Sequence, residues 1–155
     1  MRTTDNEDIE LLVIDFCDTL VYFPTCDNLG FKPRQGVMDF LEYYRKKGVP
    51  IAISSDEQRA GIDNVITGLG IRGYIAAIYG TEHLIPNDEL VMLKDISRIC
   101  IDFSTPPERT LVIGDNPGID GESAKKAGAN YIHVPIYFLD KEFTFDRLLR
   151  QDNAA

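Results

Sequence analysis

Acidic residues directly follow two of the most apolar runs in the sequence. Asp15 follows the run LLVI, and Asp115 follows the run LVIG. Two carboxylates that lie close together repel each other unless a proton or a cation lies between them. A divalent cation such as Mg²⁺ prefers oxygen ligands, and proteins often hold it through carboxylates together with the phosphate of a substrate. If the fold brings Asp15 and Asp115 together, the pattern predicts a metal-assisted site for phosphate chemistry.

Three further residues have side chains that suit such a site. Asp120 lies in the segment GDNPGID that begins just before Asp115, and it can add another carboxylate. Ser55 offers a hydroxyl to phosphate oxygens, and Lys94 can neutralise an anionic substrate. These side chains are typical of phosphoryl transfer, with Asp15 as the nucleophile that forms an aspartyl-phosphate.

Each of these residues also has a purely structural explanation. Acids are common at strand ends, and the segment GDNPGID is typical of a turn. Ser55 or its neighbour Asp56 can cap the helix that follows. Lys94 by itself would be a solvated surface charge. Their joint occurrence in this order favours the phosphate site over the separate structural explanations.

Apolar runs and helical spacings alternate along the chain and predict an α/β fold. The apolar runs are continuous, which is typical of strands that are buried on both faces of a sheet. We expect strands at 11–16, 50–54, 74–80, 111–115 and 131–137, and helices at 36–48, 57–69, 87–100, 120–129 and 140–150. Right-handed crossovers then produce a three-layer α/β/α Rossmann-like fold. Its central parallel sheet would hold about five strands in the order 3-2-1-4-5.

Ligands of such sheets bind at the carboxyl ends of the strands, where the strand order reverses. Asp15, Ser55 and Asp115 follow the three strands that we expect to meet there. The segment 21–35 is rich in turn-forming residues and predicts a loop, whose basic residue Arg34 we expect to be solvated.

Length and composition set the class of protein. The 155 residues favour one domain with a core at about 10–150 and flexible ends at 1–9 and 151–155. The formal net charge of −9 argues against nucleic acid and anionic membrane surfaces as partners. Three cysteines favour a reducing compartment. The start lacks the features of a signal peptide, and no apolar run is long enough to span a membrane, so we expect a cytoplasmic protein.

The motifs together resemble the haloacid dehalogenase superfamily, over about residues 10–136. DFCDTL resembles its first motif, with Asp15 at the nucleophile position and Thr19 at the conserved hydroxyl position of that motif. The resemblance implies that Ser55 and Lys94 represent the second and third motifs. GDNPGID resembles the fourth motif. The implied activity is a phosphatase that hydrolyses phosphate monoesters of small molecules or proteins.

The resemblance also implies a Mg²⁺ cofactor and a set of contacts around it. The metal ligands would be the carboxylates of Asp15, Asp115 and Asp120 and the backbone carbonyl of Cys17. The implied contacts to the substrate come from Ser55, Asp56, Lys94 and Asn116. Without a cap domain, the site would accept large substrates or be closed by another copy of the chain in a homo-oligomer.

Cys17 departs from the family pattern, which has an aspartate two residues after the nucleophile. That aspartate protonates the leaving group and then activates water. A thiol with an ordinary pKa near 8.5 is a poor replacement at neutral pH, and loss of a general acid–base typically costs on the order of 10²–10⁴ in rate. Cys17 therefore indicates a weakened or specialised hydrolase, with Asp18 as an alternative carboxylate that we expect to point away.

Three other functions fit some of the same residues. A non-catalytic phosphate-binding or protein-interaction module on the same scaffold would also tolerate Cys17. A dehalogenase uses an aspartate nucleophile but needs no metal-site acids such as Asp115 and Asp120. A two-component receiver carries its phosphoacceptor on the third strand, where this chain has Tyr79 and Gly80.

Overall fold

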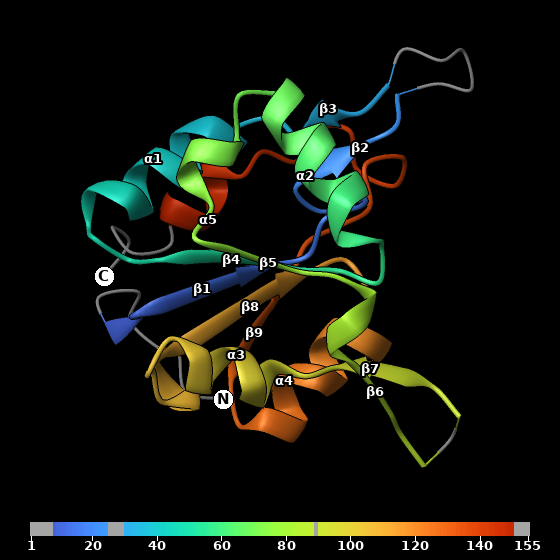
Figure 1. Ribbon diagram of the computed structural model, residues 1–155. Helices are drawn as coiled ribbons and strands as arrows, with labels where there is room; N and C mark the ends of the chain where they lie inside the picture. Colours follow the sequence, from blue (N-terminus) through green and yellow to red (C-terminus); the bar gives the residue numbers. More distant parts are fainter. Residues whose placement is uncertain (1–7, 25–29, 89, 151–155) are drawn as a thin grey trace.

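A five-stranded parallel sheet forms the centre of the structure (Figure 1). The computed structural model describes residues 8–24, 30–88 and 90–150. The strand order is β5-β4-β1-β8-β9, which confirms the expected order 3-2-1-4-5. The strands are β1 (Leu11–Ile14), β4 (Ile51–Ser54), β5 (Ala77–Tyr79), β8 (Thr110–Gly114) and β9 (Asn130–His133).

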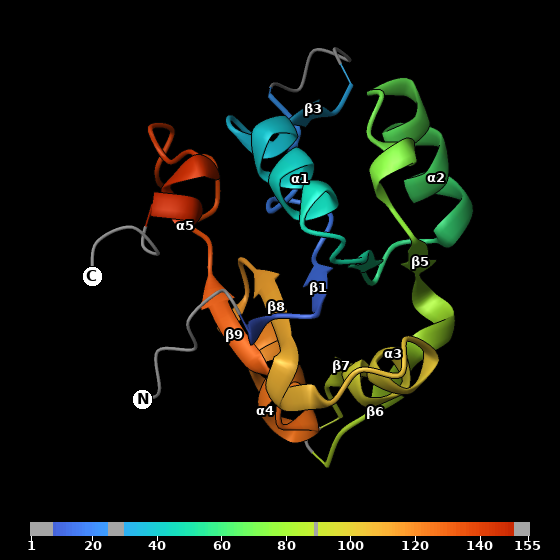
Figure 2. The same ribbon diagram turned by 90° about the vertical axis from the view of Figure 1, so that its left-hand side faces the viewer.

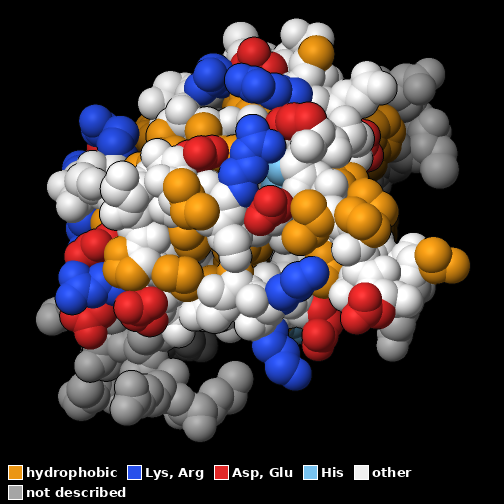
Figure 3. Space-filling view, turned by 60° about the horizontal axis from the view of Figure 1, so that its bottom comes forward, with side chains coloured by type: hydrophobic (Ala, Val, Ile, Leu, Met, Phe, Trp, Pro, Cys, Tyr) orange, Lys and Arg blue, Asp and Glu red, His pale blue; other side chains and the backbone are white. Residues whose placement is uncertain are grey.

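Helices cover both faces of the sheet, which confirms the three-layer architecture (Figure 2). Leu12 and Ile14 of β1 face the core cluster under one helical layer, and Leu11 and Val13 face the cluster under the other. This follows because successive side chains of a strand point to opposite faces. One layer holds α1 (Val37–Lys46), α2 (Arg59–Gly68) and α5 (Asp146–Arg150), and the other holds α3 (Ile96–Asp102) and α4 (Glu122–Ala127). On the face that α3 and α4 form, acidic, basic and hydrophobic side chains are interspersed (Figure 3).

The prediction of a helix at 87–100 is wrong. Residues Leu84–Pro86 (β6) and Met92–Lys94 (β7) form an antiparallel pair, and α3 begins only at Ile96. The side chain of Asp95 accepts a hydrogen bond from the backbone N–H of Arg98, at 3.1 Å, and thereby caps α3. A strand followed directly by a helix buries Leu93, Ile96 and Cys100 at a spacing that resembles one continuous helix.

The loop expected at 21–35 contains a second antiparallel pair. Val21–Tyr22 (β2) pairs with Lys32–Pro33 (β3). Arg34, expected in solvent, is buried with 2% of its surface exposed. Gly36 has a φ of 81° directly before α1, and an added Cβ there would meet Phe145 and Asp146 at 2.9 Å, so only glycine fits.

The remaining differences concern the ends of elements. The fifth strand ends at His133, and the segment expected as helix 120–129 begins with a π-helical turn at Pro117–Gly121 before α4. The last helix is restricted to Asp146–Arg150. Ile9, expected in a flexible end, is 4% exposed and belongs to the core; residues 1–7 and 151–155 lie outside the described part. Within the described ranges, the helices are too short and too polar to cross a membrane.

Candidate active site

A cleft of about 170 Å³ opens at the carboxyl ends of β1, β4 and β8. This is the edge at which the strand order reverses, as expected for a ligand site in such a sheet. Among the described residues, eight from four separate segments line the cleft: Asp15, Cys17, Asp56, Lys94, Asp115, Asn116, Ile119 and Asp120.

Asp15 lies at the floor of the cleft because it directly follows β1. Its backbone N–H donates to the carbonyl of Ile113 at 2.9 Å, which extends the pairing of β1 with β8 by one residue. Its side chain is 11% exposed. One carboxylate oxygen lies 2.8 Å from Nζ of Lys94, and the other lies 3.2 Å from Oγ1 of Thr19.

Thr19 lies between the two acids that follow β1 and β8. Its hydroxyl lies 3.2 Å from Asp15 and 2.9 Å from Asp115. A hydroxyl has a single proton to donate, so it can satisfy only one of these carboxylates at a time. The residue thereby ties the loop after β1 to the end of β8.

Lys94 is the one cation among the described residues that line the cleft, and it comes from the last position of β7. Its side chain is 4% exposed, and Nζ lies 2.8 Å from Asp15 and 2.5 Å from Asp120. Burial lowers the pKa of a lysine, but the two carboxylates outweigh burial here and raise the pKa of Lys94 above its usual range. The hydroxyl of Ser123 accepts a hydrogen bond from the backbone N–H of Lys94 at 2.9 Å and fixes the strand against α4.

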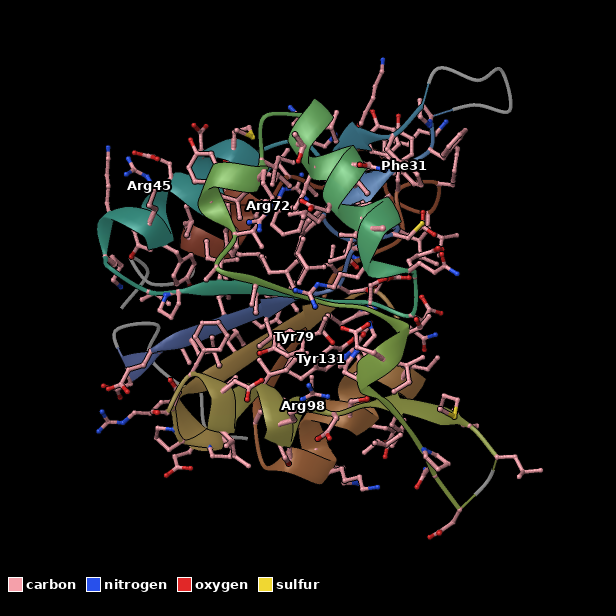
Figure 4. All side chains as sticks on the ribbon, viewed as in Figure 1. Phe31, Arg45, Arg72, Tyr79, Arg98 and Tyr131 are labelled. Carbon is pink, nitrogen blue, oxygen red and sulfur yellow. The ribbon has the colours of Figure 1, made fainter. Side chains whose placement is uncertain are left out.

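Asp120 approaches the cleft from the π-helical turn that precedes α4. Its second oxygen accepts a hydrogen bond from the backbone N–H of Asn116 at 3.2 Å. A Cβ at position 114 would overlap this carboxylate, so glycine at the end of β8 makes room for Asp120. Beneath the sheet, on the side of α3 and α4, Tyr131 donates to the carbonyl of Gly114 at 3.0 Å (Figure 4).

The three carboxylates form a candidate site for a cation. Asp15, Asp115 and Asp120 each offer an oxygen atom, and these atoms lie within 4.8 Å of one another. Burial raises the pKa of Asp15 to about 6 even though Lys94 opposes the shift. Burial and the charge of Asp15 likewise raise the pKa of Asp120 to about 6. Ionisation of such buried acids costs free energy, and a bound cation reduces this cost because it attracts the negative charges. An all-oxygen donor set of this kind suits Mg²⁺.

Ser55, Asp56 and Asn116, which we expected to contact the substrate, differ in their exposure to the cleft. Ser55 is fully buried, and its hydroxyl accepts the backbone N–H of Glu57 at 3.1 Å. Its side chain is not part of the cleft lining, whereas Asp56 and Asn116 are exposed lining residues. The oxygen of the Asn116 side chain accepts the N–H of Gly118 at 3.0 Å, which stabilises the turn after β8.

Cys17 lines the cleft as a neutral thiol. Burial, assisted by the charges of Asp18 and Asp15, raises the pKa of Cys17 to about 11. Asp18 is absent from the described residues that line the cleft, and it adopts a φ of 61°. Neither side chain therefore offers a carboxylate general acid in the cleft.

Arg34 and Ser123 stabilise the loops and strands around the cleft. No sequence pattern predicted this role for either residue. Arg34 donates from Nη1 to the carbonyl of Asp18 at 2.9 Å and to that of Pro135 at 2.8 Å. It thereby ties the loop after β1 to the chain that follows β9. The partners of Arg34 lie far along the chain, and no local pattern marks them.

Comparisons with known proteins agree with the fold. Residues 21–134 match the family described as haloacid dehalogenase-like hydrolase. The match begins after the loop that holds Asp15, so the site geometry supplies the argument for that residue. No curated protein sequence matches the chain.

Solved structures with the same fold include hydrolases from several bacteria. A predicted phosphoglycolate phosphatase from Haemophilus somnus has a TM-score of 0.69 at 14% identity, covering 93% of this chain and 98% of that one. A hydrolase of the haloacid dehalogenase superfamily from Ehrlichia chaffeensis has a TM-score of 0.67 at 13% identity, covering 94% and 95%. CbbY from Rhodobacter sphaeroides, solved with xylulose-(1,5)-bisphosphate, has a TM-score of 0.65 at 14% identity, covering 88% and 91%.

Proposed function

Because the chain belongs to the haloacid dehalogenase-like hydrolases, we propose that it is a Mg²⁺-dependent phosphohydrolase that acts on phosphate monoesters. The observation that carries the proposal is the environment of Asp15. Its carboxylate lies at the floor of the cleft, held by Lys94 and Thr19, beside Asp115 and Asp120. A fixed carboxylate next to a buried ammonium and further acids suits nucleophilic attack on phosphorus.

Asp15 acts as the nucleophile in this proposal. One carboxylate oxygen forms a bond to phosphorus as the bond from phosphorus to the leaving oxygen breaks, which yields an aspartyl-phosphate. Water then attacks phosphorus, releases inorganic phosphate and regenerates the carboxylate. Lys94 keeps Asp15 oriented and reduces the negative charge that the phosphoryl oxygens meet.

The same proposal assigns the remaining residues of the cleft. Mg²⁺ would be held by Asp15, Asp115, Asp120 and the backbone carbonyl of Cys17, and it would supply positive charge for the phosphoryl oxygens. Lys94 binds the phosphoryl group in this proposal, whereas Asp56 and Asn116 face the leaving group. Ser55, whose side chain lies outside the lining, fixes the turn after β4 through the N–H of Glu57 and so positions Asp56. The donor set within 4.8 Å supports the metal assignment.

Cys17 limits the substrates in this proposal. A thiol with a pKa of about 11 does not give up its proton readily at neutral pH, so the leaving group receives little help. Substrates with acidic leaving groups, such as aryl phosphate esters and acyl phosphate anhydrides, depend least on such help. The same observation favours the alternative function, a module that binds phosphate groups but does not hydrolyse phosphate esters.

The proposal includes an open site, without a cap domain among the described residues. The chain between β1 and β4 contributes the short β2–β3 pair and α1, and the chain between β4 and α3 contributes α2 and the β6–β7 pair, within the residues that the structure describes. An open site accepts phosphorylated small molecules or phosphorylated proteins, or it is completed by another copy of the chain. The net charge of −9 argues against nucleic acid, and we place the protein in the cytoplasm.

Phosphate release tests the function directly. The native protein, Asp15→Asn and Cys17→Asp are assayed with aryl, acyl and alkyl phosphates, with Mg²⁺ or with a chelator. We expect Mg²⁺-dependent release by the native protein and none by Asp15→Asn. We expect Cys17→Asp to hydrolyse alkyl phosphates on the order of 10²-fold faster than the native protein, because it restores a general acid.

The remaining outcomes decide between the two functions. Release by Cys17→Asp alone would support the binding module on an intact scaffold. Release by Asp15→Asn at the native rate would contradict the assignment of the nucleophile. Circular dichroism of each variant ensures that any loss of activity is not a loss of folding.

A further inference from the structure

We propose that Asp56 selects phosphate monoesters whose leaving group carries a positive charge, an inference that rests on the proposed phosphohydrolase function. Asp56 immediately follows Ser55 after β4 and lines the cleft. It is exposed and lies on the opposite side of Asp15 from the residues that follow β8, because β1 separates β4 from β8 in the sheet.

The charges of the cleft are strongly unbalanced. Four carboxylates line it, from Asp15, Asp56, Asp115 and Asp120, and Lys94 is the one cation among the described lining residues. The ammonium of Lys94 already contacts Asp15 at 2.8 Å and Asp120 at 2.5 Å. No positive charge of the lining is therefore left for Asp56.

Asp56 also lies outside the carboxylate cluster that can hold a metal. That cluster comprises Asp15, Asp115 and Asp120. Four carboxylates and one ammonium leave three negative charges in the cleft, and a divalent cation reduces them to one. The remaining charge belongs to Asp56, which faces the incoming substrate without a counterion in the described lining.

The depth of the cleft places this charge next to the leaving group. Lys94 and Asp120 are buried at the floor, whereas Asp56 and Asn116 are exposed at the mouth. A phosphoryl group attacked by Asp15 occupies the floor, so the rest of the ester extends toward the mouth. Among the described lining residues, Asp56 is the exposed charged side chain that it meets there.

The expected preference is large enough to measure. A single charge pair at a partly exposed site changes an affinity on the order of tenfold. Replacement of a cationic by an anionic leaving group changes an attraction into a repulsion, so the two kcat/KM values should differ by about a hundredfold.

Three esters of similar size test the preference. The values of kcat/KM are measured with Mg²⁺ for 4-(aminomethyl)phenyl, 4-(hydroxymethyl)phenyl and 4-(carboxymethyl)phenyl phosphate, aryl esters whose leaving groups depend little on a general acid. We expect the native protein to prefer them in that order, and Asp56→Asn to reduce the ratio between the first and the last about a hundredfold, because both the attraction and the repulsion come from Asp56. Glu108→Gln is the matched control, because Glu108 is exposed and precedes β8, at the opposite edge of the sheet from the cleft. An equal change in both variants, or a native preference for the 4-(carboxymethyl)phenyl ester, would overturn the proposal.

Binding of phosphonates separates this proposal from the phosphohydrolase itself. Calorimetry with Mg²⁺ compares 3-aminopropylphosphonate with 2-carboxyethylphosphonate, neither of which can be hydrolysed at an ester bond. Tighter binding of the amine in the native protein, lost in Asp56→Asn, supports the selection by Asp56 even if no ester is turned over. Equal binding of both phosphonates together with active turnover would contradict the role of Asp56 and leave the phosphohydrolase intact.

Discussion

At the scale of single residues, the buried acids of the site lower the stability of the folded protein when they are ionised. Asp15 and Asp120 share one ammonium, that of Lys94, and both carboxyls are largely buried. Burial raises the pKa of each acid to about 6. The folded protein therefore binds these protons more tightly than the unfolded chain does. The stability from this source is present at acidic pH and is lost as the pH rises from about 4 through about 6.

Asp15→Asn should therefore stabilise the protein in the absence of metal. At pH 8 with a chelator, we expect the free energy of unfolding to rise by about 1–2 kcal/mol, because the neutral amide removes a buried negative charge but weakens the contact with Lys94. Urea denaturation measures the change. Asp56→Asn is the matched control in the same cleft and should alter stability by no more than about 0.5 kcal/mol, because Asp56 is exposed. A loss of stability in Asp15→Asn would contradict the argument.

At the scale of elements, the β6–β7 pair positions Lys94, and His83 secures that pair. The ring nitrogen Nδ1 of His83 contacts the carbonyl of Gly80, which can only accept, so Nδ1 carries the proton. Nε2 then accepts a hydrogen bond from the hydroxyl of Ser54 at 2.7 Å. The carbonyl of His83 accepts the N–H of Asp95 at 3.2 Å. His83 thus links the end of β4 to the residue after Lys94.

This link predicts a loss of stability at acidic pH. Burial lowers the pKa of His83 below its ordinary value of 6.5, helped by the charge of Lys94, although the carbonyl of Gly80 and the acids Glu82 and Asp95 oppose the shift. The unfolded chain then binds the proton more readily, so the contribution of neutral His83 is complete above about pH 6.5 and is lost as the pH falls below it.

His83→Gln isolates this contribution. We expect the variant to be less stable than the native protein by about 1–3 kcal/mol at pH 8, because buried hydrogen bonds are lost. The difference between the two proteins should shrink between pH 7 and pH 5, since only the native protein carries the histidine. Urea denaturation at each pH measures it, and the shared effects of Asp15 and Asp120 cancel in the comparison. A difference that is constant with pH would show that His83 does not titrate in this way.

At the scale of the whole molecule, the acidic charge couples folding to cation binding. The chain carries a formal net charge of −9, and three of its carboxylates converge within 4.8 Å at one sheet edge. An unfolded chain does not assemble these oxygens, so a cation that binds them stabilises the folded state by mass action.

Mg²⁺ should therefore raise the stability of the native protein in a saturable manner. At a concentration a hundredfold above the dissociation constant, we expect about 2.7 kcal/mol of added stability, measured by urea denaturation. Asp120→Asn should lose most of this gain. NaCl at matched ionic strength is the control, because screening alone also relieves repulsion among acidic side chains. An equal gain with NaCl, or in Asp120→Asn, would argue against a specific site.

Local patterns were sufficient to predict the sheet and the convergence of its acids. Continuous apolar runs mark strands that are buried on both faces, and alternation with helices determines parallel order. Asp15 and Asp115 come to neighbouring strand ends if the first strand is central, and the structure has β1 beside β8.

Tertiary contacts decided what local patterns could not. Lys94 lies on a strand rather than a helix because the β6–β7 pair is held by His83 and by Ser123, which are distant from it in sequence. Arg34 is buried because its carbonyl partners at Asp18 and Pro135 come from two separate loops. Sequence periodicity reports which side chains are buried within one element. Only the packing of distant segments determines which polar groups they meet, and hence the pKa values and the unbalanced charge of the cleft.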